Sequence, residues 1–236
     1  MQKTPVPDLE YRIVHEEGGV VVVDKPALLP STGRKLDDRR CLQWAMIQRN
    51  HGDMVWAVHQ LDTGTSGLNV FVTKKSLVPV WQERLRAATA RKRYLGIIHG
   101  RLPKAQVTVD EPIGWTGAPP NRRWGIARKG KHARSHFQEL GASPDGSRSV
   151  ISVRIETGRT HQIRVHLEHL GLALVGEPFY RSQPCEALPR VALHAWKLRF
   201  TDGVAPDRFD AAVPEDLRTL ALACGADAAV LGDAPG

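Results

Sequence analysis

Short apolar runs, separated by polar and glycine-containing turns, predict a chain built mainly from β-strands. The first two runs, 11–14 and 20–23, flank the turn residues 16–19, which is the pattern of a β-hairpin. Pro26 ends the second run, because proline cannot donate a hydrogen bond to a neighbouring strand. Residues 149–156 alternate apolar and polar side chains, as expected for a strand with one buried face. Further strands are expected at 55–58, 69–73, 106–109 and 134–137, and around Tyr94.

Two segments in the first half have apolar residues spaced by three and four, which predicts helices. One covers 42–49, with Asp37 or Asp38 as its N-terminal cap. The other covers 77–90, with Ser76 as its cap. The residues expected on the inner side of the second helix are Val80, Leu85 and Ala88.

A third helix is predicted at 160–171, with Thr160 as its cap and Gly171 as its C-terminal stop. Arg164 lies away from the apolar line of this helix and near its start, so its side chain is free to point into a cleft. The apolar line consists of Ile163, Leu167 and Leu170.

Length and composition indicate one domain with a substantial core. The chain has 236 residues, of which 42% are apolar. The domain is expected to cover 10–204, after a lead-in at 1–9 and before a tail at 205–236 that contains a short helix opened by Pro214. Lys and Arg number 33 against 25 Asp and Glu, which gives a net charge of +8 and favours a polyanionic partner such as nucleic acid.

The cysteines are three in number and far apart, at Cys41, Cys185 and Cys224. They indicate neither a disulfide framework nor a zinc site, and they fit a reducing compartment. His161 and His166 lack the i, i+4 spacing of a two-histidine zinc helix, so no metal is expected. The N-terminus has no apolar signal segment, and no run is long enough to cross a bilayer. We expect a monomer located in the cytoplasm.

The most informative loop is 59–68, which lies between two apolar runs and places one carboxylate, Asp62, at a turn. Gly64 and Gly67 are expected to supply unusual backbone angles and to permit close approach of another chain segment. The loop's hydroxyl groups can hold the turn or contact a polar substrate. An aspartate that only bonds its own backbone is the alternative interpretation of Asp62.

Cationic stretches are candidates for phosphate contacts. Residues 91–93 are Arg-Lys-Arg and lead directly into Tyr94, although a core-edge tyrosine after solvated charges also has this pattern. Lys25 is expected either to reach phosphate or to be a solvated strand end. Between 106 and 139, a Pro- and Gly-rich insert combines cations with Trp124, which suits contact with an RNA backbone and an unpaired base, whereas a mobile solvated loop is the alternative. Its basic residues are Arg122, Arg123, Arg128, Lys129, Lys131, His132 and Arg134.

Four stretches resemble motifs of the RluA-type pseudouridine synthases. Residues 59–67 match the family's signature loop His-Arg-Leu-Asp-x-x-Thr-Ser-Gly at every specified position except Gln60, where the family usually has arginine. Residues 158–164 carry the family motif Gly-Arg-Thr-His-Gln-Ile-Arg without a change. Lys92-Arg93-Tyr94 matches the family's Lys-x-Tyr, and 191–195 resembles its Leu-His-Ala strand. Together the matches extend from about residue 11 to 200.

The resemblance implies an α+β domain with the pseudouridine synthase fold: a bent, mixed and mainly antiparallel sheet with flanking helices around a central catalytic cleft. It assigns catalysis to Asp62, as nucleophile or as the base that removes a ribose proton. Arg164 would pair with Asp62, since a guanidinium within ~4–6 Å favours the ionised form of a carboxyl group. Tyr94 would lie against the target uracil. The candidate RNA-binding residues around these three are His59, Gln60, Thr65, Ser66, Arg93, Arg159, His161 and Gln162.

The implied function is isomerisation of uridine to pseudouridine in ribosomal or transfer RNA, without a cofactor. The target uridine must leave its stack to enter the cleft. Gln60 is shorter than arginine and uncharged, so it is expected to alter base extrusion or target choice. No room is expected upstream of residue 10 for the small RNA-binding domain that many relatives carry, so the catalytic domain and its basic loops would find the target alone.

Three other functions are the alternatives to this interpretation. A catalytically weak or inactive RNA-binding protein could keep the same fold, with Gln60 as the mark of lost activity. A hydrolase that uses Asp62 would need a second carboxylate at motif spacing, and the sequence offers none. A membrane-surface role would need a basic amphipathic helix, and the predicted helices are too mixed in charge.

Overall fold

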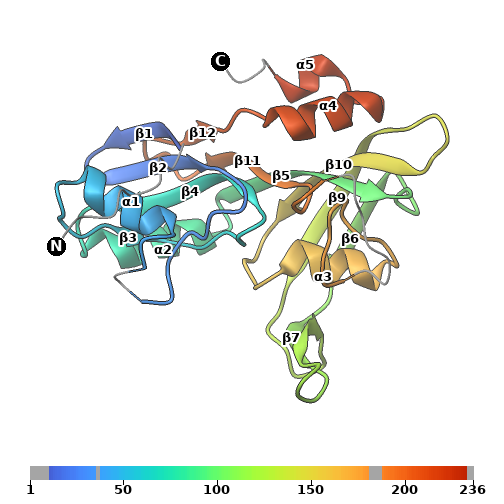
Figure 1. The fold of residues 1–236 in the computed structure, drawn as a ribbon, viewed down its shortest axis with the longest axis horizontal. Helices are drawn as coiled ribbons and strands as arrows, with labels where there is room; N and C mark the ends of the chain where they lie inside the picture. Colours follow the sequence, from blue (N-terminus) through green and yellow to red (C-terminus); the bar gives the residue numbers. More distant parts are fainter. Residues whose placement is uncertain (1–10, 36–37, 181–187, 233–236) are drawn as a thin grey trace.

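A long, bent sheet forms the centre of the molecule (Figure 1). The computed structural model describes residues 11–35, 38–180 and 188–232. The strands of this sheet are β1 (Arg12–Glu17), β2 (Val20–Lys25), β3 (Trp56–Ala57), β4 (Ser66–Val72), β5 (Ala90–His99), β6 (Gln106–Asp110), β9 (Arg134–Ala142), β10 (Arg148–Ile155), β11 (Leu193–Phe200) and β12 (Arg208–Asp210). A separate two-stranded sheet consists of β7 (Ile113–Thr116) and β8 (Arg123–Ile126). The helices are α1 (Leu42–Arg49), α2 (Leu77–Arg86), α3 (Gln162–His169), α4 (Glu215–Ala223) and α5 (Ala228–Leu231).

The large sheet has the strand order β1-β2-β4-β11-β5-β10-β9-β6, with β3 added to β4 and β12 added to β11. β4 and β11 run parallel, whereas the other neighbouring strands are antiparallel. The parallel pair lies in the middle, so residues from the first third and the last third of the chain meet there. The predicted α+β class with a mixed, mainly antiparallel sheet is confirmed.

Both faces of the sheet are covered, because successive side chains of a strand point to opposite sides. In β2, Val22 packs in the cluster around Trp81 of α2, and Val23 packs in the cluster around Met46 of α1. The other half of the sheet follows the same rule. There, Ile97 of β5 packs in the cluster that contains α4, and Ile98 packs in the cluster that contains α3.

The predicted helices are present, but their caps differ from the predictions. Ser76 has helical backbone angles and its side chain makes no capping bond. Thr160 lies outside α3, whose cap position is taken by His161 in the left-handed conformation, with φ of 54°. Asp38 accepts a hydrogen bond from the backbone two residues on, not from α1. Asp37 lies outside the described residues.

The inner side of α2 is also shifted from the predicted one. Val80 is 57% exposed, and Ala88 is exposed beyond the end of the helix, whereas Trp81 and Leu85 are buried. The helix ends at Arg86 because the following residue adopts an extended backbone. The prediction was therefore confirmed at Leu85 and wrong at Val80 and Ala88.

The described C-terminal residues pack on the sheet. Pro214 precedes α4, as predicted, whereas α5 was not predicted. Leu217 of α4 and Leu231 of α5 are buried in the same cluster as Ile97. Cys41 and Cys224 are buried free thiols, and Cys185 lies outside the described residues. In the part of the chain described here, no helix combines the length and apolar character needed to cross a membrane.

Candidate active site

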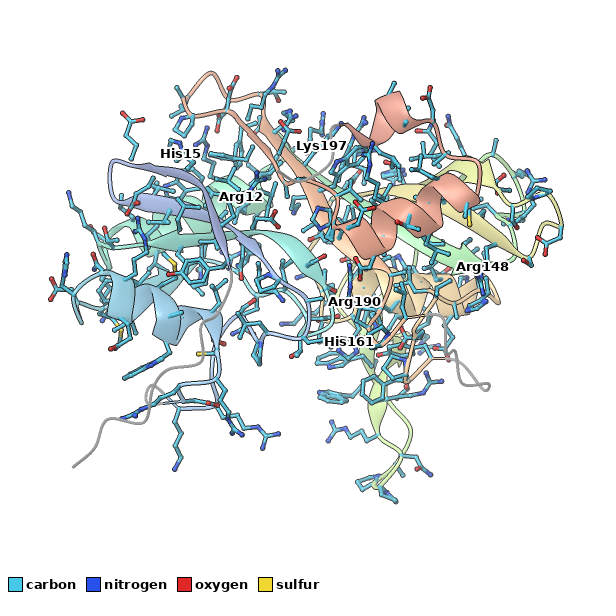
Figure 2. All side chains as sticks on the ribbon, turned by 45° about the horizontal axis from the view of Figure 1, so that its top comes forward. Arg12, His15, Arg148, His161, Arg190 and Lys197 are labelled. Carbon is cyan, nitrogen blue, oxygen red and sulfur yellow. The ribbon has the colours of Figure 1, made fainter. Side chains whose placement is uncertain are left out.

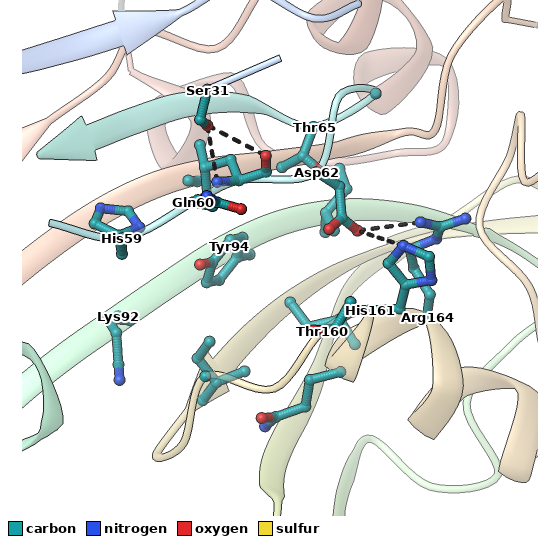
Figure 3. Close-up of a pocket in the computed structure, with 18 of the residues that line it drawn as sticks. Ser31, His59, Gln60, Asp62, Thr65, Lys92, Tyr94, Thr160, His161 and Arg164 are labelled. Carbon is teal, nitrogen blue, oxygen red and sulfur yellow. Dashed lines mark hydrogen bonds and ion pairs between the residues drawn. The ribbon is translucent and has the colours of Figure 1, made fainter. Parts of the chain in front are cut away.

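Asp62 lies in the loop that connects β3 to β4. The N–H of Thr65 donates to the carbonyl of Asp62 at 3.0 Å and closes a turn. Ser31 fixes the preceding residue, because its Oγ accepts from the N–H of Leu61 at 3.0 Å and donates to the carbonyl of Leu61 at 3.2 Å. The backbone of the loop is thus held at several points, while the carboxylate, 27% exposed, faces the cavity (Figure 3).

Gly67 marks the place where β4 approaches β11. Its φ is +104°, and a Cβ atom there would lie 2.3 Å from the carbonyl oxygen of Ala195. Only glycine fits this position, as the sequence predicted. Gly64 does not have a positive φ, and it packs against Val191. The expectation of an unusual backbone angle was therefore wrong at Gly64.

Lys25 lies beneath the loop and is fully buried. Its ammonium donates to the carbonyls of Pro26 and Leu29 at 2.9 and 2.7 Å, and to that of Thr63 at 3.4 Å. Burial lowers the pKa of Lys25 to about 7, although the nearby Asp62 opposes this shift. Both predicted roles of Lys25, phosphate contact and solvated strand end, are wrong, because the side chain turns inward and fastens the loop to the end of β2.

Arg164 lies in the first turn of α3 and points at Asp62 (Figure 3). Its Nη1 donates to Asp62 Oδ2 at 3.1 Å. Its Nε and Nη2 donate to the two oxygens of Glu177 at 2.8 and 2.7 Å. The guanidinium is thereby fixed on one edge by Glu177 and presents its remaining edge to Asp62, which is the pairing that the motif implies.

Glu177 was not predicted from the sequence as part of the site. Its side chain is 1% exposed, and its Oε1 also accepts from the N–H of Phe179 at 2.9 Å. A buried carboxylate needs such partners to offset desolvation. The sequence contains no spacing that links Glu177 to Arg164 or Asp62, so only the fold could reveal the clamp.

His161 is held beside Asp62 by the strained start of α3. Its Nδ1 lies 2.7 Å from the hydroxyl of Tyr180, and its Nε2 lies 3.9 Å from Asp62 Oδ2. Burial lowers the pKa of His161, while Asp62 acts in the opposite direction. A left-handed backbone is uncommon for a histidine and is tolerated only where the surroundings fix it. Here the contacts of the ring with Tyr180 provide that fixation.

Tyr94, on β5, borders the cavity near the Asp62 loop (Figure 3). Burial raises the pKa of its phenol, and the negative charge of Asp62 raises it further. Tyr94 therefore stays protonated at neutral pH and presents a neutral ring. Tyr94 also packs against the core cluster that contains Ile163 and Leu167 of α3.

The cavity that contains these groups has a volume of about 1000 Å³. Cations outnumber carboxylates on its walls, so it is suited to an anionic ligand. Its acidic lining residues, among those described, are Asp62 and Glu156. Its Lys and Arg lining residues are Arg86, Lys92, Arg93, Arg159, Arg164, Arg190 and Lys197. Among the described residues, no group of three or more His, Cys, Asp and Glu side chains is arranged to hold a metal ion.

Three of the predicted binding residues have their polar groups engaged inside the protein. His59 Nε2 accepts from the N–H of Val70 at 3.1 Å, and burial lowers the pKa of His59 to about 4. Ser66 Oγ lies 2.9 Å from Nδ1 of His194. The amide of Gln162 receives two hydrogen bonds and donates two, all within the segments 134–135 and 157–159. This geometry suits residues that position the site.

The remaining predicted binding residues line the cavity. The hydroxyl of Thr65 is buried and has no hydrogen-bond partner among the described residues, which is uncommon for a buried polar group. Gln60 is exposed and donates to Thr32 Oγ1 at 2.8 Å. Arg93 is exposed, and Arg159 donates through Nε to the carbonyl of His132 at 2.8 Å.

Arg190 is a second buried guanidinium of the site that the sequence did not single out. It binds both oxygens of Asp216, at the start of α4, at 2.8 and 2.7 Å, and its Nη1 lies 3.5 Å from Ser66 Oγ. Arg190 thus ties α4 to the first residue of β4. Arg190 and His161, both labelled in Figure 2, line the same cavity.

Phe179 borders the cavity and is 68% exposed. Its ring is nearly parallel to that of His161, with centroids 6.4 Å apart, and the guanidinium carbon of Arg164 lies 5.5 Å from its centroid. The ring is therefore exposed on the wall of the cavity, beside Arg164 and His161.

The comparisons with known proteins agree with the geometry. Residues 19–169 match the family model described as RNA pseudouridylate synthase. The chain is 30% identical to the dual-specificity RNA pseudouridine synthase RluA of Escherichia coli over 80% of this chain and 86% of that protein. It is 32% identical to the ribosomal large subunit pseudouridine synthase D of Nitrosomonas europaea over 90% of this chain and 64% of that protein.

A solved structure shares the fold. The human RNA pseudouridylate synthase domain containing 1 superimposes with a TM-score of 0.71 at 24% identity, over 95% of this chain and 90% of that one. The resemblance stated from the motifs is therefore confirmed by the family model, by the relatives and by the fold. The chain belongs to the RNA pseudouridylate synthase family.

Proposed function

We propose that Asp62 is the catalytic carboxylate for conversion of uridine to pseudouridine in a structured RNA, with Arg164 as its partner and Tyr94 against the base. The observation that carries this proposal is the Glu177–Arg164–Asp62 chain of ion pairs, which aims one carboxylate into a cationic cavity. The second carboxylate of the cavity, Glu156, is bonded by His136 and Arg154, so this site does not favour a two-carboxylate hydrolase.

The reaction rearranges bonds without oxidation or net hydrolysis. The bond between the ribose and N1 of uracil breaks, the base turns, and C5 is joined to the same ribose carbon, while the C5 proton is lost and N1 gains one. Asp62 can act as nucleophile or as the base that removes a ribose proton. Either role needs an ionised carboxylate, which a guanidinium at 3.1 Å favours.

Substrate binding is assigned to the groups that line the cavity. The target uridine leaves its stack, at a cost of a few kcal/mol. We assign the stacking surface for the extruded base to Tyr94 and the hydroxyl contact to Thr65. Arg93 and Arg159 would contact phosphate, and Gln60 would contact the RNA at the place where the family usually has arginine. His59, Ser66, His161 and Gln162 would position these groups.

The substrate is proposed to be ribosomal or transfer RNA, bound by a monomer in the cytoplasm. One relative named above is a ribosomal large subunit synthase, which supports the ribosomal class, and the other is a dual-specificity RNA synthase.

The test is to incubate the purified wild type with unmodified tRNA transcripts and, separately, with unmodified ribosomal RNA, and to count pseudouridine by nucleoside mass spectrometry. We expect product on one of the two RNAs. Bound RNA without product would contradict the proposal and favour the inactive RNA-binding alternative, in which case Gln60→Arg is the first variant to assay.

A further inference from the structure

Residues 113–131 form an arm that projects from the body of the molecule (Figures 1 and 2). The strands of the arm, β7 and β8, pair only with each other in the described structure and are separate from the large sheet. The arm corresponds to most of the basic insert seen in the sequence. From this position the arm can contact a part of a large ligand that extends beyond the cavity.

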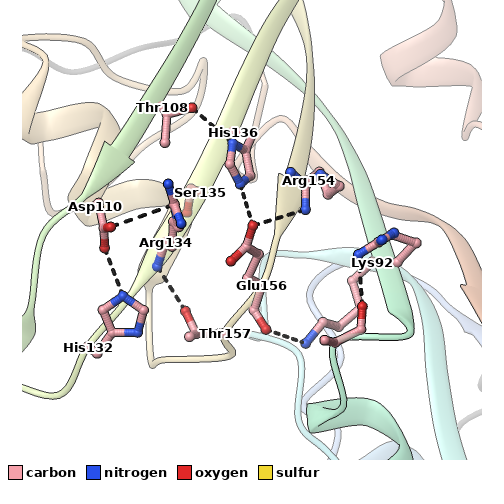
Figure 4. A network of polar contacts seen from close by, with 12 residues as sticks. Lys92, Thr108, Asp110, His132, Arg134, Ser135, His136, Arg154, Glu156 and Thr157 are labelled. Carbon is pink, nitrogen blue, oxygen red and sulfur yellow. Dashed lines mark hydrogen bonds and ion pairs between the residues drawn. The ribbon is translucent and has the colours of Figure 1, made fainter.

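The two ends of the arm are fastened together and to the site. The N–H and carbonyl of Ile113 bond the carbonyl and N–H of Lys131 at 2.9 and 2.8 Å. Just outside the arm, His132 Nε2 lies 2.8 Å from Asp110 Oδ1 (Figure 4). Arg159, which borders the cavity, donates to the carbonyl of His132. The arm therefore has a fixed base next to the cavity.

The base of the arm also packs against the catalytic elements. Trp124 and Ile126 pack with Val165 of α3 and with Tyr180, and Tyr180 is the residue whose hydroxyl bonds His161. A segment of RNA that leaves the cavity on this side would meet the arm.

The charge of the arm is entirely of one sign. It contains five cations and no aspartate or glutamate. Arg123 is paired with Glu168 of α3 at 2.7 Å. The other four have no carboxylate within ion-pair distance among the described residues and are exposed: Arg122, Arg128, Lys129 and Lys131.

An aromatic stack orders one of these cations. Trp115 is 51% exposed and stacks on Trp124 with ring centroids 4.3 Å apart. The guanidinium carbon of Arg122 lies 4.9 Å from the centroid of Trp115. A guanidinium held against an indole loses less freedom when it binds, and its planar set of N–H donors matches a phosphate group.

We propose that the arm is a second RNA-contact surface, which binds the phosphate backbone of the substrate RNA outside the cavity. The proposal rests on the proposed function for the identity of the substrate. Contacts to phosphate carry no sequence information, so the arm contributes to affinity and to the orientation of the RNA, whereas the cavity selects the uridine.

The test compares two triple variants of equal charge change. The arm variant is Arg122→Gln, Arg128→Gln and Lys129→Gln. The control is Lys74→Gln, Lys75→Gln and Lys104→Gln, which removes three exposed cations that do not border the cavity. The Kd is measured at several salt concentrations with the RNA that gave product, or with an unmodified tRNA transcript if neither did. The rate of product formation at saturating RNA is measured alongside.

In the arm variant we expect the slope of log K against log salt to fall in magnitude by about 2–3, at ~0.7–0.9 per lost phosphate contact. Affinity should drop roughly 10- to 100-fold near 0.15 M salt, with little change in the rate at saturating RNA. Equal effects of the two triple variants on slope and Kd would overturn the proposal, as would a loss of rate without a loss of affinity. The proposal would also be overturned if the arm variant bound RNA normally but no longer bound polyglutamate. That result would make the arm a binding surface for an acidic protein.

A single variant tests the guanidinium itself. Arg122→Lys keeps the charge but removes the planar set of donors, so we expect weaker binding with an unchanged salt slope. Wild-type affinity in Arg122→Lys would contradict the role given to the aromatic stack. If the wild type makes no pseudouridine, the proposed function fails, while the difference in salt slope still decides whether the arm binds RNA.

Discussion

Phe179 is the most exposed large apolar residue of the described chain, and it borders the cationic cavity of the site. Its backbone N–H is held by Glu177, so the ring is carried by the same clamp that aims Arg164. Nucleobases stack on exposed aromatic rings in many single-strand binding sites. We infer that Phe179 stacks on a nucleotide next to the target uridine.

The prediction for Phe179→Ala is a loss of about 5- to 150-fold in kcat/KM, because stacking on one base contributes ~1–3 kcal/mol. Phe179→Tyr keeps the ring and should stay close to the wild type. Val80→Ala is the control, since Val80 is 57% exposed on α2 and lies away from the cavity. An alanine variant at position 179 with wild-type kcat/KM would show that the ring contacts nothing in the reaction.

His194 is a completely buried histidine of the site. Its Nδ1 lies 2.9 Å from Ser66 Oγ, and burial, aided by the neighbouring Arg190, lowers its pKa to about 3. The ordinary pKa of an unfolded histidine is about 6.5. Between these values the unfolded chain binds a proton that the folded protein excludes. The contribution of His194 to stability is therefore complete above pH ~6.5 and is lost progressively as the pH falls toward 3.

Urea unfolding at pH 7.5 and at pH 5.0 tests this linkage. Between pH 7.5 and pH 5.0 the wild type should lose about 2 kcal/mol of unfolding free energy through His194. The total loss in His194→Asn should be smaller than that of the wild type by this amount. His51→Asn is the matched control, because His51 is exposed and its positive φ of 57° suits asparagine. Equal pH dependence in His194→Asn and the wild type would contradict the assignment.

At the scale of elements, α4 completes the core behind the catalytic strands. Leu217 is fully buried against β5 and β10, and Arg190 bonds Asp216 at the start of the helix. The helix is amphipathic, with Leu222 on its outer side, 41% exposed. Although it follows the last recognisable motif in sequence, α4 belongs to the same packed unit as the site.

Truncation of the two leucines should therefore have very different effects. Leu217→Ala creates a cavity and should lower the free energy of unfolding by about 2–5 kcal/mol. Leu222→Ala on the same helix should change it by less than about 0.5 kcal/mol. Denaturant unfolding of the two variants measures both values, and similar losses in the two would show that α4 does not pack as described.

The prediction of elements succeeded where the signal was local and failed where tertiary contacts decided. The β1–β2 hairpin was predicted, because two apolar runs flank a turn that contains Gly18 and Gly19. The start of α3 was not predicted correctly. The hydrogen bond between His161 and Tyr180 holds His161 in a left-handed conformation, so His161 and not Thr160 takes the cap position. No pattern near Lys25 reveals that three carbonyl groups, one of them from Thr63, surround its ammonium.

At the scale of the whole molecule, the fold places together residues that are far apart in the sequence. Arg164 lies 102 positions from Asp62, and the parallel pairing of β4 with β11 joins Gly67 to Ala195. The motifs predicted that Asp62 and Arg164 would pair, since the family resemblance carried that information. They gave no indication of Glu177, Arg190 or Phe179, whose roles depend on the three-dimensional arrangement alone.

We expect Asp62 to perform the chemistry and to contribute little to RNA binding. The most direct measurement is the single-turnover rate of pseudouridine formation by Asp62→Asn at saturating RNA, with the Kd for the same RNA measured in parallel. We predict no detectable product from Asp62→Asn and a Kd within a few-fold of the wild type. A rate within tenfold of the wild type would contradict this expectation and place the catalytic group elsewhere in the cavity.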